Sequence, residues 1–444
     1  MLEGIKKLHF VGIGGVGMSA IAEVMLDKGY EISGSDLSES AVVKHLKAKG
    51  ATIYKGHDAL NVEGKEALVL SSAIHQDNPE LVAAKAKGLK LFHRSDILAY
   101  LLNDAKGIAV AGAHGKTTTS SMISVVLEHA KVDPTILIGG FVDYLKGNAK
   151  LGKSDYLVAE ADESDGSFLK FYPKIAVVTN IEDDHMDHYG SMENIIKAFI
   201  QFVQNLDKEN IRNIADKVDR KYISYALDHD ADYMAKDIKI DGPHTSFTVI
   251  YKGEVLGDVA LNIPGKHNVL NALATIAVCH HMGLSIEEIA EGFKVFSGTK
   301  RRFQTKFRNE NVWIVDDYAH HPTEIQTTIK AAKQTNPKRL IVAFQPHRYS
   351  RTQLLQKEFG SCFVGADVLV LTDIYAASED PIEGISGKTI VDEVKKQTGV
   401  DAIYIEKLED IAPWLKENIQ AGDLIITMGA GNIYTVGENL AQSL

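Results

Sequence analysis

Cysteine is almost absent from this sequence of 444 residues, which contains only Cys279 and Cys362, each among apolar neighbours. Two cysteines cannot form a disulfide framework, so we expect both thiols to be reduced and buried, as in a reducing compartment. The sequence also lacks the order of charged, apolar and small residues that marks a signal peptide, and it has no apolar run of transmembrane length. These absences predict a cytoplasmic protein without membrane insertion.

Long basic runs are missing as well. The sequence has 48 lysines and arginines against 59 aspartates and glutamates, and its formal net charge is -11. The two signs are interspersed, which disfavours a general binder of nucleic acid or of membrane surfaces. A local basic site for a small anion is compatible with this composition, so we expect small-molecule partners and no nucleic acid.

The pattern of apolar residues predicts the fold class. Short apolar runs that end in Gly, Asp or Asn alternate with helical patterns from end to end, which is typical of an α/β fold with mainly parallel sheets. At roughly 150 residues per domain, a chain of this length should form about three domains. We place them at residues 1–105, 106–298 and 299–444. In the second block, alternating patterns from about 221 to 262 predict added antiparallel hairpins.

A glycine-rich motif joins the first predicted strand to the first predicted helix. Its members are Gly12, Gly14, Gly15, Val16 and Gly17. Glycines allow a tight turn, and the helix N-terminus that follows favours a phosphate group. Asp36 ends the next strand, at the spacing where a Rossmann fold places an acid near a ribose. The motif predicts a ligand that contains a diphosphate, and at this point NAD and a UDP-sugar are equally acceptable.

A second glycine-rich motif, AGAHGKTTT, follows a strand and opens a helix. Its candidate phosphate-binding residues are Gly112, His114, Gly115, Lys116, Thr117 and Thr118. The amides of such a loop cradle phosphate oxygens, the lysine offsets their charge, and the hydroxyl after the lysine binds magnesium. The first glycine of a full Walker A sequence would fall at Val110 and is absent. The shorter loop still predicts a nucleoside triphosphate site.

Two later strands of the second block end in acids and a histidine. Ligands of open α/β sheets lie beyond the carboxyl ends of the strands, so these clusters should approach the second glycine motif. Glu160 and His185 are the predicted ligands of Mg²⁺, for which Mn²⁺ is a possible substitute. We interpret Asp165 as a solvated loop acid.

In the third block, basic and aromatic residues follow two predicted strands. They are Tyr318 and His320 after one strand, and His347, Arg348 and Arg351 after the other. Arginines at the carboxyl end of a strand suit a carboxylate or a phosphate. Arg302 lies at the predicted junction of the second and third blocks, where it could reach the phosphates of ATP.

Ten motifs, in the same order over the whole chain, resemble those of the Mur ligases. They are HFVGIGGVGMS, ISGSD, SSAI, AGAHGKTTT, AEADESDGSF, TNIEDDHMDH, PGKHNVLNA, RRF, DDYAHHPTE and QPHRYSR. The resemblance implies a Rossmann-like N-terminal domain, a central P-loop ATPase domain with added antiparallel strands, and a Rossmann-like C-terminal domain. It also implies an ATP-dependent ligation of L-alanine to the carboxylate of UDP-N-acetylmuramate through an acyl phosphate, in the synthesis of peptidoglycan precursors.

The same resemblance implies roles for individual residues. The UDP-substrate would bind at the first glycine motif with Asp36, Ser71 and Ser72. ATP would bind at the second glycine motif with His267, Asn268, Arg302 and Asp317. L-alanine would bind at Tyr318, His320, His347, Arg348 and Arg351. Mg²⁺ would bind at Thr117, Glu160 and His185, and the catalytic residues would be Lys116, His320, Arg302 and Arg348.

Several alternatives stay open. A related ligase that recycles a tripeptide onto UDP-N-acetylmuramate shares much of this layout. An NAD-dependent oxidoreductase would use the first glycine motif and Asp36 but would leave AGAHGKTTT unexplained. A nucleotide sensor would bind ATP without turnover. In solution we expect a monomer or a weak homodimer.

Overall fold

The computed structural model describes residues 1–182, 186–205, 210–211, 222–377 and 379–444. The chain forms two compact units. The first comprises residues 1–236, 249–257 and 270–296, and the second comprises residues 237–248, 258–269 and 297–444. Across the described ranges, none of the helices has both the length and the apolar character needed to cross a bilayer.

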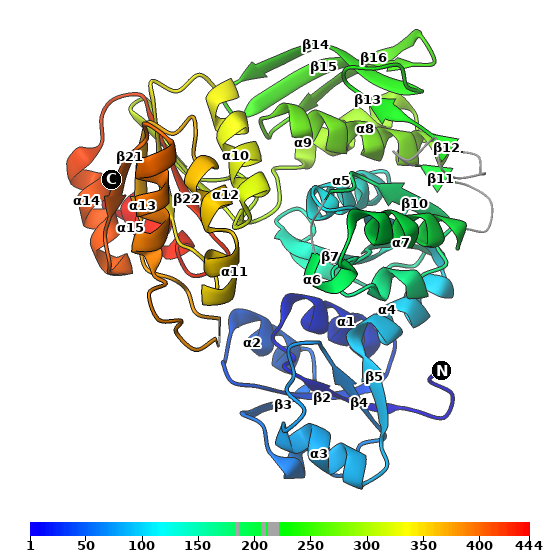
Figure 1. The fold of residues 1–444 in the computed structure, drawn as a ribbon. Helices are drawn as coiled ribbons and strands as arrows, with labels where there is room; N and C mark the ends of the chain where they lie inside the picture. The colour runs from blue at the N-terminus through cyan, green and yellow to red at the C-terminus, as the bar shows by residue number, and fades with distance from the viewer. Residues whose placement is uncertain (183–185, 206–209, 212–221, 378) are drawn as a thin grey trace. The chain divides into compact units, whose positions relative to one another are not determined.

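The N-terminal part of the first unit is a parallel sheet of five strands in the order β3-β2-β1-β4-β5. The strands are β1 Lys7–Val11, β2 Glu31–Asp36, β3 Thr52–Lys55, β4 Ala67–Leu70 and β5 Lys90–His93. The helices are α1 Val16–Asp27, α2 Ala41–Ala48, α3 Pro79–Ala86 and α4 Arg94–Asn103. Helices α1 and α2 lie on one face of the sheet and α3 on the other (Figure 1). This strand order is that of the first five strands of a Rossmann fold, so the prediction of a Rossmann-like domain is confirmed.

A mixed sheet of seven strands follows, in the order β12-β11-β10-β6-β9-β7-β8. Its strands are β6 Lys106–Ala111, β7 Thr135–Val142, β8 Gly147–Lys150, β9 Tyr156–Glu160, β10 Ile175–Val178, β11 Asn210–Ile211 and β12 Tyr222–Ile223. Its helices are α5 Lys116–His129, α6 Met186–Tyr189 and α7 Met192–Gln204. The central strands β6, β9 and β10 run parallel, and among the strand pairs that the described residues form in this sheet only β7 and β8 are antiparallel. Their carboxyl ends therefore meet at one edge, where the second glycine motif begins.

The region predicted as antiparallel hairpins forms them only in part. Strands β14 Tyr233–Asp241, β15 His244–Tyr251 and β16 Glu254–Leu261 follow one another through two-residue connections, which only hairpins allow. Strand β13 Tyr225–Ala226 instead pairs in parallel with β14. The loop between β13 and β14 is closed by Asp232, whose carboxylate accepts hydrogen bonds from the amide and the hydroxyl of Ser224. Helices α8 Lys266–His281 and α9 Ile286–Val295 come next.

The second unit contains a sheet of six strands in the order β17-β18-β22-β19-β20-β21. The strands are β17 Gln304–Arg308, β18 Val312–Asp317, β19 Arg339–Phe344, β20 Val368–Leu371, β21 Asp401–Tyr404 and β22 Asp423–Met428. The helices are α10 Pro322–Gln334, α11 Tyr349–Leu354, α12 Gln356–Ser361, α13 Gly387–Gln397, α14 Ile411–Asn418 and α15 Tyr434–Ser443. Only β17 runs antiparallel to its neighbour.

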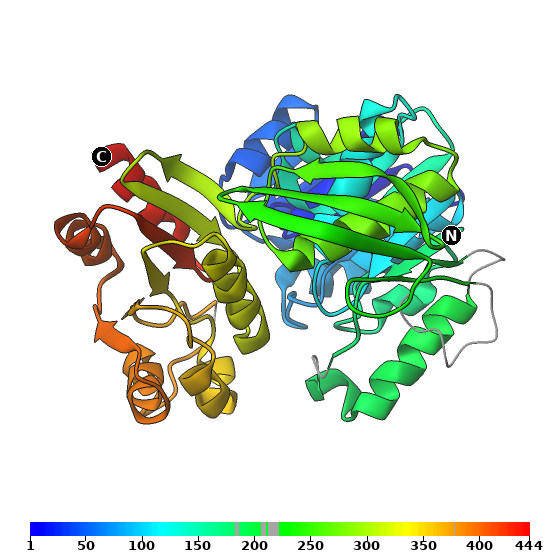
Figure 2. The same ribbon diagram turned by 90° about the horizontal axis from the view of Figure 1, so that it is seen from above.

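Both faces of this six-stranded sheet are buried. Along β19, Leu340 and Val342 pack with α10, α12 and α13, whereas Ile341 and Ala343 pack with α14 and α15. Figure 2 shows α10 and α15 on opposite sides of the sheet. The alternation follows from the two-residue period of a strand, and it explains why these strands appear in the sequence as continuous apolar runs. The three-domain α/β fold is thus confirmed, whereas the boundaries at 105 and 298 stay a prediction.

Helix α9 packs closely against α5, which begins at the second glycine motif. A Cβ atom at Gly292 would lie 2.8 Å from the Cα atom of Val126. We predict that Gly292→Val destabilises the protein by about 2 kcal/mol, because a backbone atom cannot move aside as a flexible side chain can. Chemical denaturation measures the loss. The matched control is Gly399→Val, since a Cβ atom at Gly399 has nothing within 4 Å. Equal stability of the two variants would contradict the prediction.

Candidate active site

The second glycine motif is a tight loop between β6 and α5. Gly112 and Gly115 adopt φ angles of 135° and 85°, which favour glycine. A Cβ atom at Gly112 would lie 2.1 Å from the hydroxyl of Thr179, and one at Gly115 would lie 2.6 Å from Oδ1 of Asn271. Asn271 also accepts a hydrogen bond from Thr119. The two glycines are therefore required by both backbone conformation and space.

Lys116 is charged and folded back over this loop. Its ammonium group donates to the carbonyl oxygens of Gly112 and Ala113, at 2.5 and 3.2 Å, and to Oε1 of Glu163 at 2.7 Å. Burial, the largest influence, lowers the pKa of Lys116, but nearby carboxylates, Glu163 first among them, outweigh it and the net pKa is raised. The loop thus holds a charged ammonium group beside the amides that the sequence predicts to bind phosphate.

His114 shapes the opposite side of the loop. Its amide donates to Oδ1 of Asn180, and its carbonyl oxygen accepts from Nδ2 of Asn180 and from the hydroxyl of Thr179. Its Nε2 lies 3.2 Å from a carboxylate oxygen of Glu182. Thr118 is buried in the first turn of α5. The structure accordingly gives His114 a role in fixing the loop, and its contact with ATP stays a prediction.

Glu160 and Thr117 lie side by side at the edge where β9 ends. The hydroxyl of Thr117 is 3.2 Å from Oε2 of Glu160, and the Oε1 atom accepts from Ser120 and from the amide of Gly139. A hydroxyl and a carboxylate next to a phosphate loop are the oxygen donors that Mg²⁺ takes from proteins. These two residues fit the predicted metal. Within the described ranges, no three His, Cys, Asp or Glu side chains form a group that could hold a metal ion, and His185 lies outside those ranges.

The first glycine motif uses most of its own amides inside the protein. The amides of Gly12 and Ile13 donate to the carbonyl oxygen of Ser35. The amide of Gly15 donates to Gly12, and that of Gly14 donates to Oδ2 of Asp36. The donors that helix geometry leaves for an anion are therefore those of the first turn of α1, at Val16 and Gly17. Asp36 anchors the loop, and its contact with a ribose stays a prediction.

Ser71 and Ser72 follow β4. The carbonyl oxygen of Ser71 accepts from Ile74, while the hydroxyl of Ser72 lies 3.2 Å from Nε2 of His93 and 3.3 Å from Oδ2 of Asp165. Asp165 is a partly exposed loop acid, 30% exposed at its side chain, and it also accepts a hydrogen bond from the amide of Ser167. Burial raises the pKa of Asp165, but the hydrogen bonds from Ser167 outweigh it and the net pKa is lowered.

Three residues of the first unit were missed in the sequence and belong to this region. Glu163 holds Lys116, Asp162 forms an ion pair with Arg94 at 2.5 Å, and Arg94 begins α4. The two acids lie within the motif AEADESDGSF, so the sequence indicates where they are. It does not indicate their partners, because no local pattern shows which basic residue each acid contacts.

In the second unit, four aromatic rings form a cluster at the carboxyl ends of β18 and β19. Ring centroids are 5.4 Å apart for Tyr318 and His320, 5.9 Å for His320 and His347, and 5.6 Å for His347 and Tyr375. Burial, together with the neighbouring positive charges, lowers the pKa of His347 to about 4. Burial also lowers the pKa of His320, although Glu324 opposes the shift. Both imidazoles are therefore neutral at pH 7.

The predicted arginines border this cluster. A guanidinium nitrogen of Arg351 lies 3.3 Å from Nδ1 of His347. Arg348 adopts a left-handed φ of 73°, and its amide donates to the carbonyl oxygen of Tyr375. Arg302 lies over the ring of Tyr318 and 3.8 Å from Glu324. The structure thus brings together Tyr318, His320, His347, Arg348 and Arg351, and it places Arg302, which was predicted near ATP, beside Tyr318. Binding of L-alanine or ATP by these residues stays a prediction.

The other residues predicted around ATP are buried or partly buried, and two of them have hydrogen-bond partners within the protein. The carboxylate of Asp317 accepts from the amides of Phe303 and Ala319, and burial raises its pKa to about 6. Asn268 donates to the carbonyl oxygen of Pro264. Burial lowers the pKa of His267 to about 4. Whether these residues also contact ATP stays a prediction.

Comparisons with known proteins identify the family of this chain. Three family models match the chain: "Mur ligase family, catalytic domain" over residues 7–106, "Mur ligase middle domain" over 110–279, and "Mur ligase, glutamate ligase domain" over 301–431. The UDP-N-acetylmuramate–L-alanine ligase of Trichlorobacter lovleyi is 48% identical over 456 residues, covering 100% of both chains.

Two solved structures extend the comparison. The UDP-N-acetylmuramate–alanine ligase of Thermotoga maritima is 30% identical, with a TM-score of 0.84 and 98% of each chain covered. A murein peptide ligase from Psychrobacter arcticus is 24% identical, with a TM-score of 0.72 and 98% of each chain covered, and it shares the fold. Since the three family models together span most of the sequence, this chain belongs to the Mur ligase family.

Proposed function

We propose that this protein joins L-alanine to the carboxylate of UDP-N-acetylmuramate, with ATP converted to ADP and phosphate, in the synthesis of peptidoglycan precursors. The observation that carries the proposal is the full-length identity of 48% to an enzyme of that name. The charged Lys116 in its phosphate loop and the paired Thr117 and Glu160 support it.

We assign one task to each predicted domain. Residues 1–105 bind the UDP-substrate, 106–298 bind ATP, and 299–444 bind the amino acid. The buried, unpaired thiols of Cys279 and Cys362 suit the cytoplasm. We also propose a monomer or a weak homodimer, which light scattering over a concentration series would test.

In the first step the substrate carboxylate attacks the γ-phosphorus of ATP. The bond from that phosphorus to the bridging oxygen breaks, giving an acyl phosphate and ADP. Lys116 and Arg302 neutralise charge on the transferred group, and the loop amides hold it in line. Thr117 and Glu160 would hold Mg²⁺, which supplies further positive charge on the phosphates when it is bound.

In the second step the amine of L-alanine attacks the acyl carbon. A C–N bond forms, the C–O bond to phosphate breaks, and phosphate leaves. Arg348 and Arg351 would hold the carboxylate of L-alanine. His320 is neutral at pH 7 because burial lowers its pKa, so its imidazole can accept the proton that the amine loses.

Phosphate release from ATP with UDP-N-acetylmuramate, measured with and without L-alanine, tests the proposed function. We expect release that depends on L-alanine and a product heavier by one alanyl residue. Phosphate release with a tripeptide donor but not with L-alanine would show that the protein is the ligase that recycles a tripeptide. ATP binding without release for any donor would favour a nucleotide sensor.

Lys116→Ala should lower kcat/KM by roughly 10²–10³-fold, since the variant loses the charge that faces the phosphates. The phosphate-release assay measures the loss. Lys153→Ala, which removes an exposed lysine, serves as the control and should stay near the parent value. Near-parent turnover of Lys116→Ala, in a folded protein, would disprove the assigned role.

Glu160→Gln should raise the Mg²⁺ concentration needed for half-maximal activity by about tenfold, because a neutral amide is a weaker ligand than a carboxylate. A magnesium titration at saturating substrates checks this. Glu193→Gln makes the same chemical change at an exposed side chain and should have no effect. If both variants need the same Mg²⁺ as the parent, Glu160 is not a ligand.

Arg348→Ala should raise the KM for L-alanine by roughly 10- to 100-fold, as expected for the loss of charge-assisted hydrogen bonds to a carboxylate. The KM values for ATP and UDP-N-acetylmuramate should change less than about twofold, because the variant leaves the first unit intact. Arg308→Ala, at an exposed residue of the same unit, is the control. A uniform rise in all three KM values would instead indicate general damage.

A further inference from the structure

The first glycine motif has few donors left for a diphosphate. Four consecutive amides, from Gly12 to Gly15, already donate to the carbonyl oxygens of Ser35 and Gly12 and to the carboxylate of Asp36. An incoming anion must therefore bind at the first turn of α1, where helix geometry leaves amides unpaired. Gly17 lies in that turn. Two or three amides carry only partial charge, so a positive side chain beside them would strengthen the binding of a diphosphate.

Arg94 supplies a positive charge beside this turn. A Cβ atom at Gly17 would lie 3.3 Å from Nη1 of Arg94, so the guanidinium group passes directly over the glycine. Arg94 is the first residue of α4, which follows β5, and its side chain is partly exposed. The absence of a side chain at position 17 thus leaves space that the guanidinium group uses. A planar guanidinium is the group best suited to bind a phosphate with two hydrogen bonds.

The other nitrogen of the guanidinium group is held by an acid. Nη2 of Arg94 lies 2.5 Å from Oδ2 of Asp162. Burial raises the pKa of Asp162, but hydrogen bonds from Ser164 and the charges of Arg94 and Lys116 outweigh it, and the net pKa is lowered. The carboxylate is therefore ionised and keeps Arg94 extended beside α1. The next residue, Glu163, holds Lys116 of the ATP loop.

We propose that Arg94 is a binding residue for the diphosphate of UDP-N-acetylmuramate, and that Asp162 positions its guanidinium group before the substrate arrives. This inference rests on the proposed function, because the ligand is taken from it. Asp162 is a positioning residue, since it acts through Arg94.

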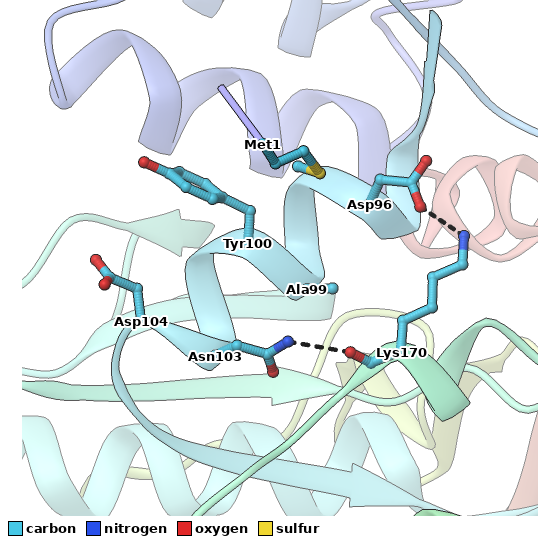
Figure 3. Close-up of a pocket in the computed structure, with 7 residues that line it drawn as sticks. All are labelled: Met1, Asp96, Ala99, Tyr100, Asn103, Asp104 and Lys170. Carbon is cyan, nitrogen blue, oxygen red and sulfur yellow. Dashed lines mark hydrogen bonds and ion pairs between the residues drawn. The ribbon is translucent and has the colours of Figure 1, made fainter. Parts of the chain in front are cut away.

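Lys170 offers a matched control for this proposal. It joins the same helix α4 to the central domain, because its ammonium group donates to Asp96 at 2.7 Å and to Ser95 at 2.9 Å. Figure 3 shows Lys170 with Asp96, Tyr100 and Asn103 at a pocket that contains no residue of the first glycine motif. Removal of Lys170 breaks an ion pair between the same two parts of the chain without removing charge near Gly17.

The test is calorimetric titration of the full-length protein with UDP-N-acetylmuramate, with UDP and with uridine, in the absence of ATP. Arg94→Ala should weaken the binding of UDP-N-acetylmuramate and of UDP by roughly 10- to 100-fold, the range for the loss of charge-assisted hydrogen bonds. The affinity of Arg94→Lys for these ligands should lie between those of Arg94→Ala and the parent. Lysine keeps the positive charge but lacks the paired N–H groups of the guanidinium. Uridine binding should be unchanged in all variants, and Lys170→Ala should bind all three ligands like the parent.

The variant Asp162→Asn distinguishes a role of the Arg94–Asp162 ion pair in ligand binding from a purely structural role. If Asp162 positions Arg94 for the diphosphate, Asp162→Asn should weaken UDP binding by a few-fold and less than Arg94→Ala does, because the variant keeps the charge of Arg94 but loses its anchor. Unchanged or tighter binding of UDP would show that Asp162 has no positioning role. If the ion pair only stabilises the fold, Asp162→Asn should weaken UDP binding as much as Arg94→Ala does, and the proposal fails. The proposal also fails if the parent protein forms product and the dissociation constant of Arg94→Ala for UDP is within twofold of the parent value. A parent protein that neither binds UDP-N-acetylmuramate nor forms product would refute the proposed function itself.

Discussion

The ion pair between Lys116 and Glu163 is the interaction on which the arrangement of the first unit depends. Both side chains are largely buried, at 18% and 3% exposed, and their charged atoms are 2.7 Å apart. Leaving one member of such a pair without its partner costs about 3–5 kcal/mol. The segment that carries Glu163 must therefore stay close to the loop that carries Lys116. Tyr189 reinforces this by donating a hydrogen bond to the carbonyl oxygen of Glu163.

The same acidic segment also faces the N-terminal domain. Asp162 and Asp165, on either side of Glu163, meet Arg94 and Ser72 there. One short loop thus contacts the second glycine motif through its middle residue, and the region proposed to bind the nucleotide sugar through its flanking residues. A shift of this loop on binding of either ligand would be felt at the other site, since each contact is a direct hydrogen bond or ion pair. This gives a physical route for coupling the two binding events within one unit.

Much of the fold could be predicted because its strands are buried on both faces. The run from Val312 to Asp317 is buried throughout, and its first four residues, VWIV, appear in the sequence as one apolar segment. Strands β17 and β21 carry a weaker signal, because they lie at the edges of the sheet and their sequences QTKFR and DAIY mix polar and apolar residues. Parallel pairing of β13 was missed for a related reason, since a strand of two residues has no periodicity to detect.

The site could be predicted only where a motif contains its own chemistry. The sequence AGAHGKTTT carries glycine, lysine and threonine at fixed spacing, and the structure brings them into one loop. Contacts between distant segments have no such signature. Arg94 and Asp162 are 68 residues apart, Lys116 and Glu163 are 47 apart, and Thr119 and Asn271 are 152 apart. Their pairing is decided by tertiary packing, which no local pattern records.

The two steps of the proposed reaction need side chains in different charge states, and the chain provides these side chains in different units. Phosphoryl transfer needs fixed positive charge, which the carboxylates around Lys116 maintain against burial. Attack by an amine needs a neutral base, and burial with nearby arginines keeps His320 and His347 unprotonated. Burial is the largest cause of the lowered pKa of His320, Glu324 opposes it, and Arg351 adds to it. Arg351, one of the two arginines that would hold the carboxylate of L-alanine, thus also helps to keep the proposed base neutral.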